Sequence, residues 1–407
     1  MLKRTIDDLK ILDGQKQFEQ EKPVGQIHIP DRSEFDVWMK SVMQRRYFTN
    51  HGPLVGKLEE VLRERLDVEH AYTVTNGTVG LMVALVALDI KGEVLVPSFT
   101  FPATVEALKW AKLTPRFVDV DPRTHMISRK TVEEHINVET SAVLGVHVWG
   151  RACDPEGLQS LCKEKGLKLI YDACHGFACD YNSTSLARFG DVSVYSMHAT
   201  KVVNAAEGGV VVTRDDALAA RINTVRNFHR TPADVEVEMR MNGKMSELQA
   251  AMALMALGKL EQNVERNKTL YYSYINGLAS LAYLKPAYLD KNGKNNFQYS
   301  VFELSEDCPL SRDQLVTILR AEGVYARRYF YPCVHRLDPY RDAHNATSRV
   351  LPNSEALAEK VFQLPSGAQV SLEDTKAIIE ILRLTLNNAG QIAERIKDIP
   401  VCEAGSQ

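Results

Sequence analysis

Three polar motifs at the ends of predicted strands offer the clearest chemistry in the sequence. Asp172 ends the apolar run LKLIYDA, and Lys201 follows the run DVSVYS within SMHATK. The third motif, TNGT at residues 75–78, lies where a strand gives way to an apolar helix. A carboxylate at the mouth of a sheet can hold a protonated ring nitrogen, a desolvated lysine can form a Schiff base, and a helix N-terminus can bind phosphate.

Each motif also has a plainer interpretation. The TNGT motif can be an ordinary helix N-cap, Asp172 can form a structural salt bridge or cap the next segment, and Lys201 can be a surface lysine. Asp172 needs a cationic or N–H partner, because an unpaired buried carboxylate costs roughly several kcal/mol. We expect desolvation to depress the pKa of Lys201.

An aromatic residue follows another predicted strand. Phe101 in SFTFPAT can stack on a planar ring, or it can pack in the core or form a hydrophobic staple. A phosphate cradle, an aromatic platform, a buried carboxylate and a loop lysine then lie on different turns of one sheet. Together these are the parts needed to hold pyridoxal 5′-phosphate, PLP.

The positions of these motifs depend on an alternation of strands and helices between residues 70 and 215. Helical patterns separate the strand-like runs AYTVT, EVLVP, PRFVDV, SAVLGVHV and LKLIYDA, and DVSVYS and GGVVVT follow as later strands. This order predicts an α/β fold with a mainly parallel, seven-stranded sheet between helices. Ligands of such a sheet gather at the carboxyl ends of its strands.

The remainder of the chain predicts a smaller C-terminal α+β domain. One long helix over about residues 245–277 leads to it, followed by the strand-like NNFQYSVFEL and the helical LSRDQLVTILRAEG and SLEDTKAIIEILRLTLNN. We predict an N-terminal extension at 1–32, a large cofactor domain at 33–277, a small domain at 278–395 and a tail at 396–407.

Composition excludes several classes of function. The 407 residues carry 49 Lys and Arg against 52 Asp and Glu, a net charge of −3, which disfavours nucleic-acid binding. The seven cysteines form no C-x-x-C pair, which favours a reducing compartment and a cytoplasmic protein. The N-terminus lacks the continuous apolar core of a signal peptide, and the most apolar stretch, Val79 to Ile90, is well short of the roughly 20 residues needed to span a membrane. Cys/His sets at zinc spacing are absent, so we expect no metal, and the missing G-x-G-x-x-G disfavours a nicotinamide oxidoreductase.

A series of motifs between Asn50 and Arg383 resembles the DegT/DnrJ/EryC1/StrS family, a group of fold-type I, PLP-dependent nucleotide-sugar aminotransferases. In chain order the motifs are NHGP, TNGT, VPSFTFPAT, VDVDP, VHVWG, IYDACHGFA, SMHATK, EGG and NGKMSELQAA. ARRYFYP and VFQLPSG resemble the C-terminal domain of that family.

The resemblance implies roles for individual residues. Lys201 would form the internal aldimine and move a proton between the substrate carbon and C4′ of the cofactor, and Asp172 would keep the pyridine nitrogen protonated. Phe101 would stack on the ring, and His175 would lie near its phenolic oxygen. Gly77, Thr78 and Ser196 would bind the phosphate. Asn242 would reach it from the partner subunit.

Some positions depart from the family or leave alternatives open. Cys174 stands where an alanine usually packs beneath the ring, and it either alters the electronics of the cofactor or fills space. Met197 replaces a common phenylalanine. Four residues, Arg327, Arg328, Tyr329 and Tyr331, contact the substrate diphosphate or the dimer interface, or they form a solvated face.

The resemblance also implies the reaction and the partners. L-glutamate would donate an amino group to a nucleotide-linked keto sugar in a homodimer with shared active sites. The motifs are most similar to enzymes that aminate C4 of dTDP-4-keto-6-deoxyhexoses for O-antigen, other polysaccharides or glycosides. C3 amination and a UDP- or GDP-linked sugar are the nearest alternatives. A catalytically silent regulatory dimer is a third, although this chain keeps Lys201 and Asp172.

Overall fold

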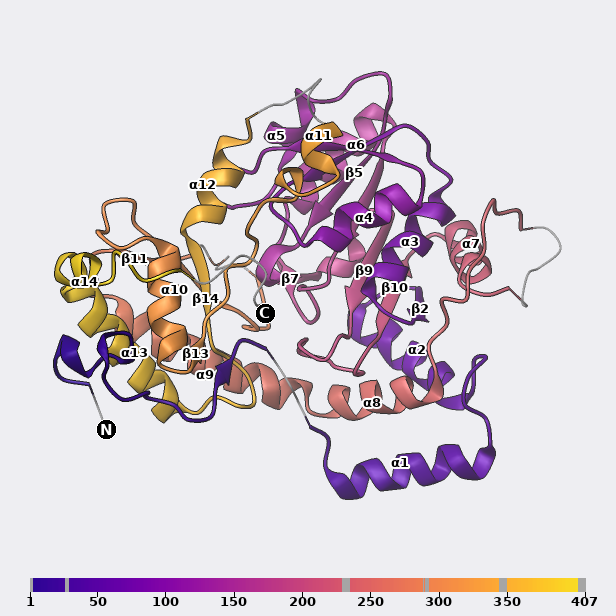
Figure 1. The fold of residues 1–407 in the computed structure, drawn as a ribbon. Coiled ribbons are helices and arrows are strands. Elements are labelled where there is room, and N and C mark those ends of the chain that lie inside the picture. Colours follow the sequence, from indigo (N-terminus) through magenta and orange to yellow (C-terminus); the bar gives the residue numbers. More distant parts are fainter. Residues whose placement is uncertain are drawn as a thin grey trace.

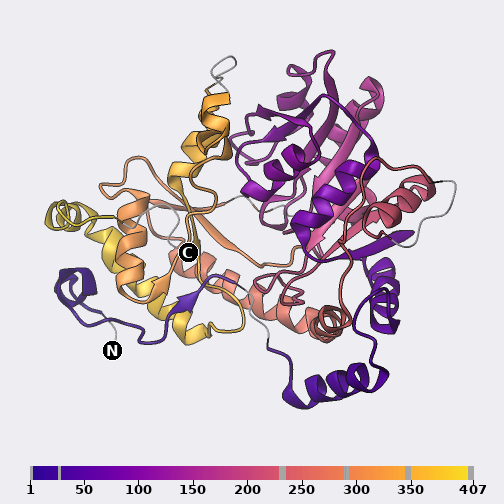
Figure 2. The ribbon, with the colours of Figure 1, turned by 45° about the vertical axis from the view of Figure 1, so that its right-hand side comes forward.

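The computed structural model describes residues 3–25, 29–228, 235–287, 289, 293–343 and 350–401. A large domain built on a seven-stranded sheet lies beside a small domain built on a three-stranded sheet (Figure 1). The view turned by 45° separates the two sheets most clearly (Figure 2). Within the described residues, no helix combines the length and the apolar character that crossing a membrane requires.

The large sheet has the strand order β2-β10-β9-β6-β5-β3-β4. Only β10 among these strands runs antiparallel to its neighbours, so the prediction of a mainly parallel sheet is confirmed. All seven strand-like runs of the sequence form its strands: β2 (His70–Val74), β3 (Glu93–Pro97), β4 (Thr114–Val118), β5 (Thr140–Val146), β6 (Lys168–Asp172), β9 (Val192–Ser196) and β10 (Gly209–Thr213).

Helices bury both faces of this sheet. Because side chains alternate along a strand, Val210 and Val212 of β10 join the core beneath α2 (Pro53–Leu66) and α8 (Glu247–Gly258), whereas Val211 joins the core beneath α3 (Gly77–Leu88). Burial on both faces explains the near-continuous apolar strands. The other helices of the large domain are α1 (Arg32–Arg45), α4 (Pro102–Trp110), α5 (Arg129–Glu133), α6 (Pro155–Lys165) and α7 (Asp216–Val225).

Two helices, α8 and α9 (Leu260–Leu278), connect the domains. Helix α8 begins where predicted, directly after Ser246. The Ser246 hydroxyl accepts a hydrogen bond from the Gln249 N–H. The prediction of one unbroken helix over 245–277 is wrong, because Lys259 has φ −113° and ψ 6°. The conformational freedom of Gly258 favours this break, and the apolar pattern continues through it without a signal.

The small domain contains the antiparallel strands β11 (Leu284–Pro286), β12 (Ser300–Leu304) and β14 (Val361–Leu364). Helices α10 (Arg312–Ala321), α12 (Pro352–Lys360), α13 (Leu372–Asn387) and α14 (Ala389–Arg395) accompany this sheet. Shorter elements of the chain are η3 (Val148–Gly150), β7 (Asp180–Tyr181), β8 (Thr184–Ser185), η4 (Leu186–Arg188), η5 (Val334–Arg336) and α11 (Tyr340–Ala343).

The N-terminal segment packs on the small domain, beside α10 and α13 (Figures 1 and 2). It contains η1 (Ile6–Asp8), η2 (Lys10–Leu12) and β1 (Lys22–Pro23), which pairs in parallel with β13 (Val324–Tyr325). Buried Glu322 accepts hydrogen bonds from the N–H groups of Lys10 at 2.7 Å and Gln17 at 2.9 Å. The domain boundaries stay a prediction, but Ile6, Leu9 and Phe18 share the core of the small domain.

A buried ion cluster joins the two domains. Glu303 on β12 lies 3.2 Å from Nε2 of His125 in the large domain and 3.1 Å from Nζ of Lys360. Burial alone would raise the pKa of Glu303, but the proximity of His125 and Lys360 outweighs it and lowers the pKa to about 2. Ionised Glu303 therefore stabilises the fold above its ordinary pKa, and that stabilisation is lost as the pH falls toward 2.

We predict that Glu303→Gln destabilises the protein near neutral pH and that the deficit shrinks in acid. Between about pH 6 and pH 3.5 the difference in unfolding free energy should narrow by about 1 kcal/mol, measured by urea denaturation. Exposed Glu306 provides the matched control, Glu306→Gln, whose difference from wild type should stay constant. A Glu303→Gln deficit that is independent of pH would contradict the account.

Candidate active site

One edge of the large sheet collects the polar residues singled out in the sequence. Because β2, β3, β6 and β9 are mutually parallel, their carboxyl ends meet there, and a cavity of about 340 Å³ opens between this edge and the small domain. Nine residues predicted for the site line it: Gly77, Thr78, Phe101, Asp172, His175, Ser196, Lys201, Arg327 and Tyr329.

The floor of the cavity is the N-terminus of α3. Asn76 is its N-cap and accepts a hydrogen bond from the Val79 N–H at 2.9 Å, so the ordinary cap interpretation of TNGT is correct for this residue. The first-turn N–H groups of Gly77 and Thr78 have no partner within the helix. These N–H groups lie at the positive end of the helix dipole. The helix terminus is therefore suited to an anion.

Close packing around Gly77 shapes this floor. A Cβ there would lie 3.1 Å from both the Cys174 sulfur and Cβ of Ser196, which is tighter than ordinary contact. At the start of β10, a Cβ on Gly209 would lie 3.0 Å from the Gly77 nitrogen. The two glycines therefore let a strand, a loop and a helix terminus approach one another, and the cap and the anion site coexist.

Asp172 ends β6 with its side chain buried. Its Oδ1 accepts a hydrogen bond from the Cys174 N–H at 3.1 Å, and its Oδ2 accepts one from the Thr104 hydroxyl at 2.7 Å. Since Thr104 donates to Asp172, it accepts from the Thr100 hydroxyl 2.8 Å away. The expected N–H partner of Asp172 is therefore present. Its second hydrogen-bond partner is a threonine hydroxyl, and not the cation that the salt-bridge alternative required.

Lys201 lies on the turn after β9, and its Nζ donates to the Tyr299 hydroxyl oxygen at 3.1 Å. Burial lowers its pKa, but the Tyr299 phenol, the Cys174 thiol and the Asp172 carboxylate together outweigh burial, and the pKa is raised. The prediction of a depressed pKa is therefore wrong for the free amine of Lys201. The sequence does not reveal which neighbours packing brings to this amine.

His175 lines the cavity as a neutral ring. Its Nδ1 accepts a hydrogen bond from the Trp149 N–H at 3.1 Å, so the ring proton is assigned to Nε2. Burial, together with the charge of Lys201, lowers the pKa of His175 well below its ordinary value. The side chain is therefore a hydrogen-bond donor to the cavity at neutral pH.

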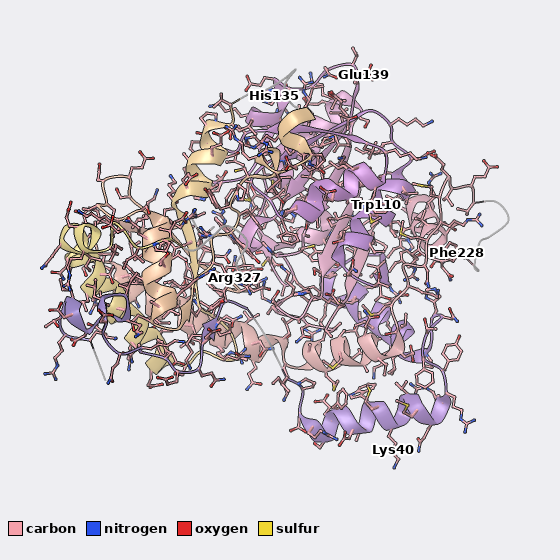
Figure 3. All side chains as sticks on the ribbon, in the orientation of Figure 1. Lys40, Trp110, His135, Glu139, Phe228 and Arg327 are labelled. Atoms are coloured by element: carbon pink, nitrogen blue, oxygen red, sulfur yellow. The ribbon has the colours of Figure 1, made fainter. Side chains whose placement is uncertain are left out.

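Aromatic and cationic side chains line the opposite wall. Phe101 caps α4 and is 49 % exposed, which excludes the core alternative for this residue. Arg327 lies over the Tyr329 ring, 5.4 Å from its centre, and its buried Nε has no hydrogen-bond partner among the described residues. Figure 3 shows Arg327 between the small domain and the large sheet.

Three residues assigned to the site lie outside the cavity lining. Arg328 is buried and pairs with Asp313 at 3.1 Å, and the Tyr331 ring lies beside the Arg328 guanidinium. A solvated face is therefore wrong for Arg328, whereas contact of Arg328 and Tyr331 with the substrate or the dimer interface stays a prediction. Asn242 is exposed and accepts a hydrogen bond from Lys244, and its role toward a partner subunit stays a prediction.

Thr104 and Tyr299 are among the residues at the site that were not anticipated. Thr104 lies within the VPSFTFPAT motif, and the pair Thr100 and Thr104 on either side of Phe101 was an available signal. Tyr299 comes from the small domain, 98 residues after Lys201, and had no local signal. Within the described residues, no group of three or more His, Cys, Asp and Glu side chains could hold a metal ion.

The cavity of this α/β fold brings a helix N-terminus, a buried carboxylate and a lysine together at one sheet edge. The model of the DegT/DnrJ/EryC1/StrS aminotransferase family matches residues 31–383, and the chain belongs to this family. The predicted family, the fold and the class of sugar aminotransferase are confirmed.

Individual relatives refine the comparison. The chain is 34% identical to dTDP-4-amino-4,6-dideoxy-D-glucose transaminase of Shigella dysenteriae, over 89% of this chain and 99% of that protein. It is 28% identical to GDP-perosamine synthase of Vibrio cholerae, over 86% and 95%. The crystal structure of DesI in the presence of its TDP-sugar product is similar with a TM-score of 0.92 at 37% identity, covering 97% of this chain and all of that chain.

We predict that Thr104→Val destabilises the protein by about 1–3 kcal/mol, because it removes a hydrogen bond to a buried carboxylate at nearly constant volume. Thr104→Ser keeps the hydroxyl and should recover most of the loss. Urea denaturation of both variants measures the difference. Equal unfolding free energies for the valine and serine variants would show that the hydroxyl does not support Asp172.

Proposed function

We propose that the cavity binds PLP. The observation that carries this is the arrangement of an anion-binding helix terminus, the buried carboxylate of Asp172 and the amine of Lys201 around one cavity. The cradle at Gly77, which a Cβ would obstruct, fits a phosphate on the cavity floor. The donors and acceptors present match the phosphate, ring nitrogen and aldehyde of this cofactor.

Different residues of the chain would hold different parts of the cofactor. The N–H groups of Gly77 and Thr78, together with the Ser196 hydroxyl, bind the phosphate. Asp172 holds a proton on the ring nitrogen, and the Thr104 hydroxyl keeps its carboxylate in place. When bound, the cofactor supplies an exchangeable carbonyl and an electron-withdrawing ring.

The remaining side chains act on the ring and on the substrate. Phe101 offers an aromatic face, and His175 donates a hydrogen bond near the phenolic oxygen. Lys201 would move a proton between the substrate carbon and C4′ of the cofactor. Arg327, whose Nε is free of hydrogen bonds within the described residues, binds anionic groups of the substrates beside Tyr329.

We further propose that the amino group passes from L-glutamate to C4 of dTDP-4-keto-6-deoxy-D-glucose. The similarity to the Shigella dysenteriae transaminase and to DesI supports a dTDP-linked acceptor and this position. The similarity to GDP-perosamine synthase makes a GDP-linked sugar the second candidate. The product would serve O-antigen, other polysaccharide or glycoside synthesis.

The active unit in this proposal is a cytoplasmic homodimer in which Asn242 of the partner subunit completes the phosphate site. Exposed apolar residues on and after α1, namely Val37, Met43, Tyr47 and Phe48, support a covered surface there. The unpaired cysteines of the described residues support a reducing compartment.

A competition assay tests the proposed reaction. With L-glutamate and equal amounts of dTDP-, UDP- and GDP-linked 4-keto-6-deoxy sugars, we expect the dTDP sugar to be aminated at least about tenfold faster, measured by mass spectrometry. Lys201→Ala should lose at least about 1,000-fold in rate, while exposed Lys91→Ala stays near wild type. Faster amination of the GDP sugar would overturn the nucleotide assignment, and an active Lys201→Ala variant would overturn the mechanism.

A further inference from the structure

The amine of Lys201 has one hydrogen-bond partner that comes from the other domain. Lys201 follows β9 of the large sheet, whereas Tyr299 immediately precedes β12 of the small sheet. The Nζ donates to the phenol oxygen at 3.1 Å, and Nζ lies 5.8 Å from the centre of the Tyr299 ring. The contact therefore joins the two domains at the proposed reacting atom.

Packing holds the phenol in this position. Tyr299 is 9% exposed, and its ring centre lies 4.6 Å from that of His175. His175 is itself held by the Trp149 N–H and lies parallel to the Phe330 ring at 6.0 Å. The phenol is thus fixed between an imidazole and the lysine, with little freedom to turn away.

We propose that Tyr299 is a positioning residue that holds the free amine of Lys201 and sets the pH at which this amine loses its proton. The phenol oxygen is an acceptor for an ammonium group, and a charge-assisted hydrogen bond of this kind is stronger than one to a neutral amine. It therefore favours the protonated lysine. The functional consequence rests on the proposed role of Lys201 in proton transfer.

Other groups near Lys201 also affect the pKa of its amine. Asp172 and Cys174, at the end of β6, favour the ammonium, whereas burial opposes it. His175 is neutral, as described above. The remaining titratable groups on the cavity wall are His198, Glu207, Arg327 and Tyr329. Removing the Tyr299 hydroxyl leaves all of these in place, so the change in Lys201 reports on this one hydrogen bond.

The hydrogen bond between Lys201 and Tyr299 would act within the proposed transaminase cycle. A lysine that has released the cofactor must stay near the reacting carbon, and it must be neutral when it takes a proton. An ammonium held by Tyr299 stays in place and cannot attack a carbonyl until it loses its proton. Tyr299 would therefore hold the amine ready between the two half-reactions.

Carbamylation by cyanate tests the proposal, because cyanate is small and reacts with the neutral amine. The probe is applied to the full-length chain without cofactor at fixed pH, and the Lys201 peptide is quantified by mass spectrometry. Tyr299→Phe should be modified about tenfold faster at Lys201, which corresponds to a pKa lowered by about one unit. Tyr299→Gln keeps an acceptor and should stay near the wild-type rate.

Tyr329→Phe makes the same chemical change elsewhere in the cavity and should leave the Lys201 modification rate within about twofold of wild type. If Tyr299→Phe does not fold, Tyr299→Leu replaces it in the comparison with Tyr299→Gln. Equal or slower modification in the variant that lacks an acceptor would overturn the proposal.

The pH dependence of the half-reaction with L-glutamate gives a second readout. In Tyr299→Phe the rising limb of the rate should move about one unit toward lower pH, because the neutral amine forms at lower pH. A wild-type chain that does not transaminate would defeat the proposed function, while the cyanate result would still decide the role of Tyr299. A transaminating chain with unchanged cyanate rates would defeat the role of Tyr299 alone.

Discussion

The site is organised around a buried carboxylate whose hydrogen-bond partners are uncharged. Asp172 closes an apolar strand, and among the described residues its carboxylate is held by an amide N–H and by a threonine hydroxyl. A carboxylate is costly to bury without a hydrogen-bonded cation, and a cation held against it in the cavity would offset that cost. The protonated ring nitrogen of the proposed cofactor has the required charge. The environment of Asp172 thus links the packing of the sheet to the chemistry of the cavity.

The direction of the strands makes this environment possible. Four parallel strands deliver Gly77, Phe101, Asp172 and Lys201 to one edge, although these residues are far apart in sequence. The antiparallel strand β10 enters at the same edge, and its Gly209 allows the helix terminus to lie against it. The small domain completes the cavity with Tyr299 and Arg327, so neither domain alone contains the whole site.

Much of the large domain could be predicted because its information is local. The runs that form β2 to β6, β9 and β10 are apolar and β-branched, and the residues at their ends are polar. Lys259 shows the limit of a periodic signal, since a single non-helical residue divides α8 from α9 without disturbing the apolar pattern. The two-residue strand β1 shows another, because its partner β13 lies about 300 residues away in sequence and leaves no local trace.

The same limit applies to the site. Lys201 and Asp172 follow strands and could be found, but the raised pKa of Lys201 depends on Tyr299, which tertiary packing brings to it. In the run ARRYFYP, adjacent residues have different environments: Arg327 faces the cavity, whereas Arg328 pairs with Asp313. Neighbouring residues of similar type cannot be separated in this way until the fold is known.

In the proposed function, PLP is bound at this sheet edge through Lys201. The most direct measurement is borohydride reduction of the purified enzyme, followed by peptide mass mapping of the modified lysine. If PLP is bound through Lys201, we expect the yellow absorbance of the cofactor to disappear and the added mass of reduced PLP to lie on Lys201. Modification of a different lysine, or an active enzyme with no modified lysine, would contradict it.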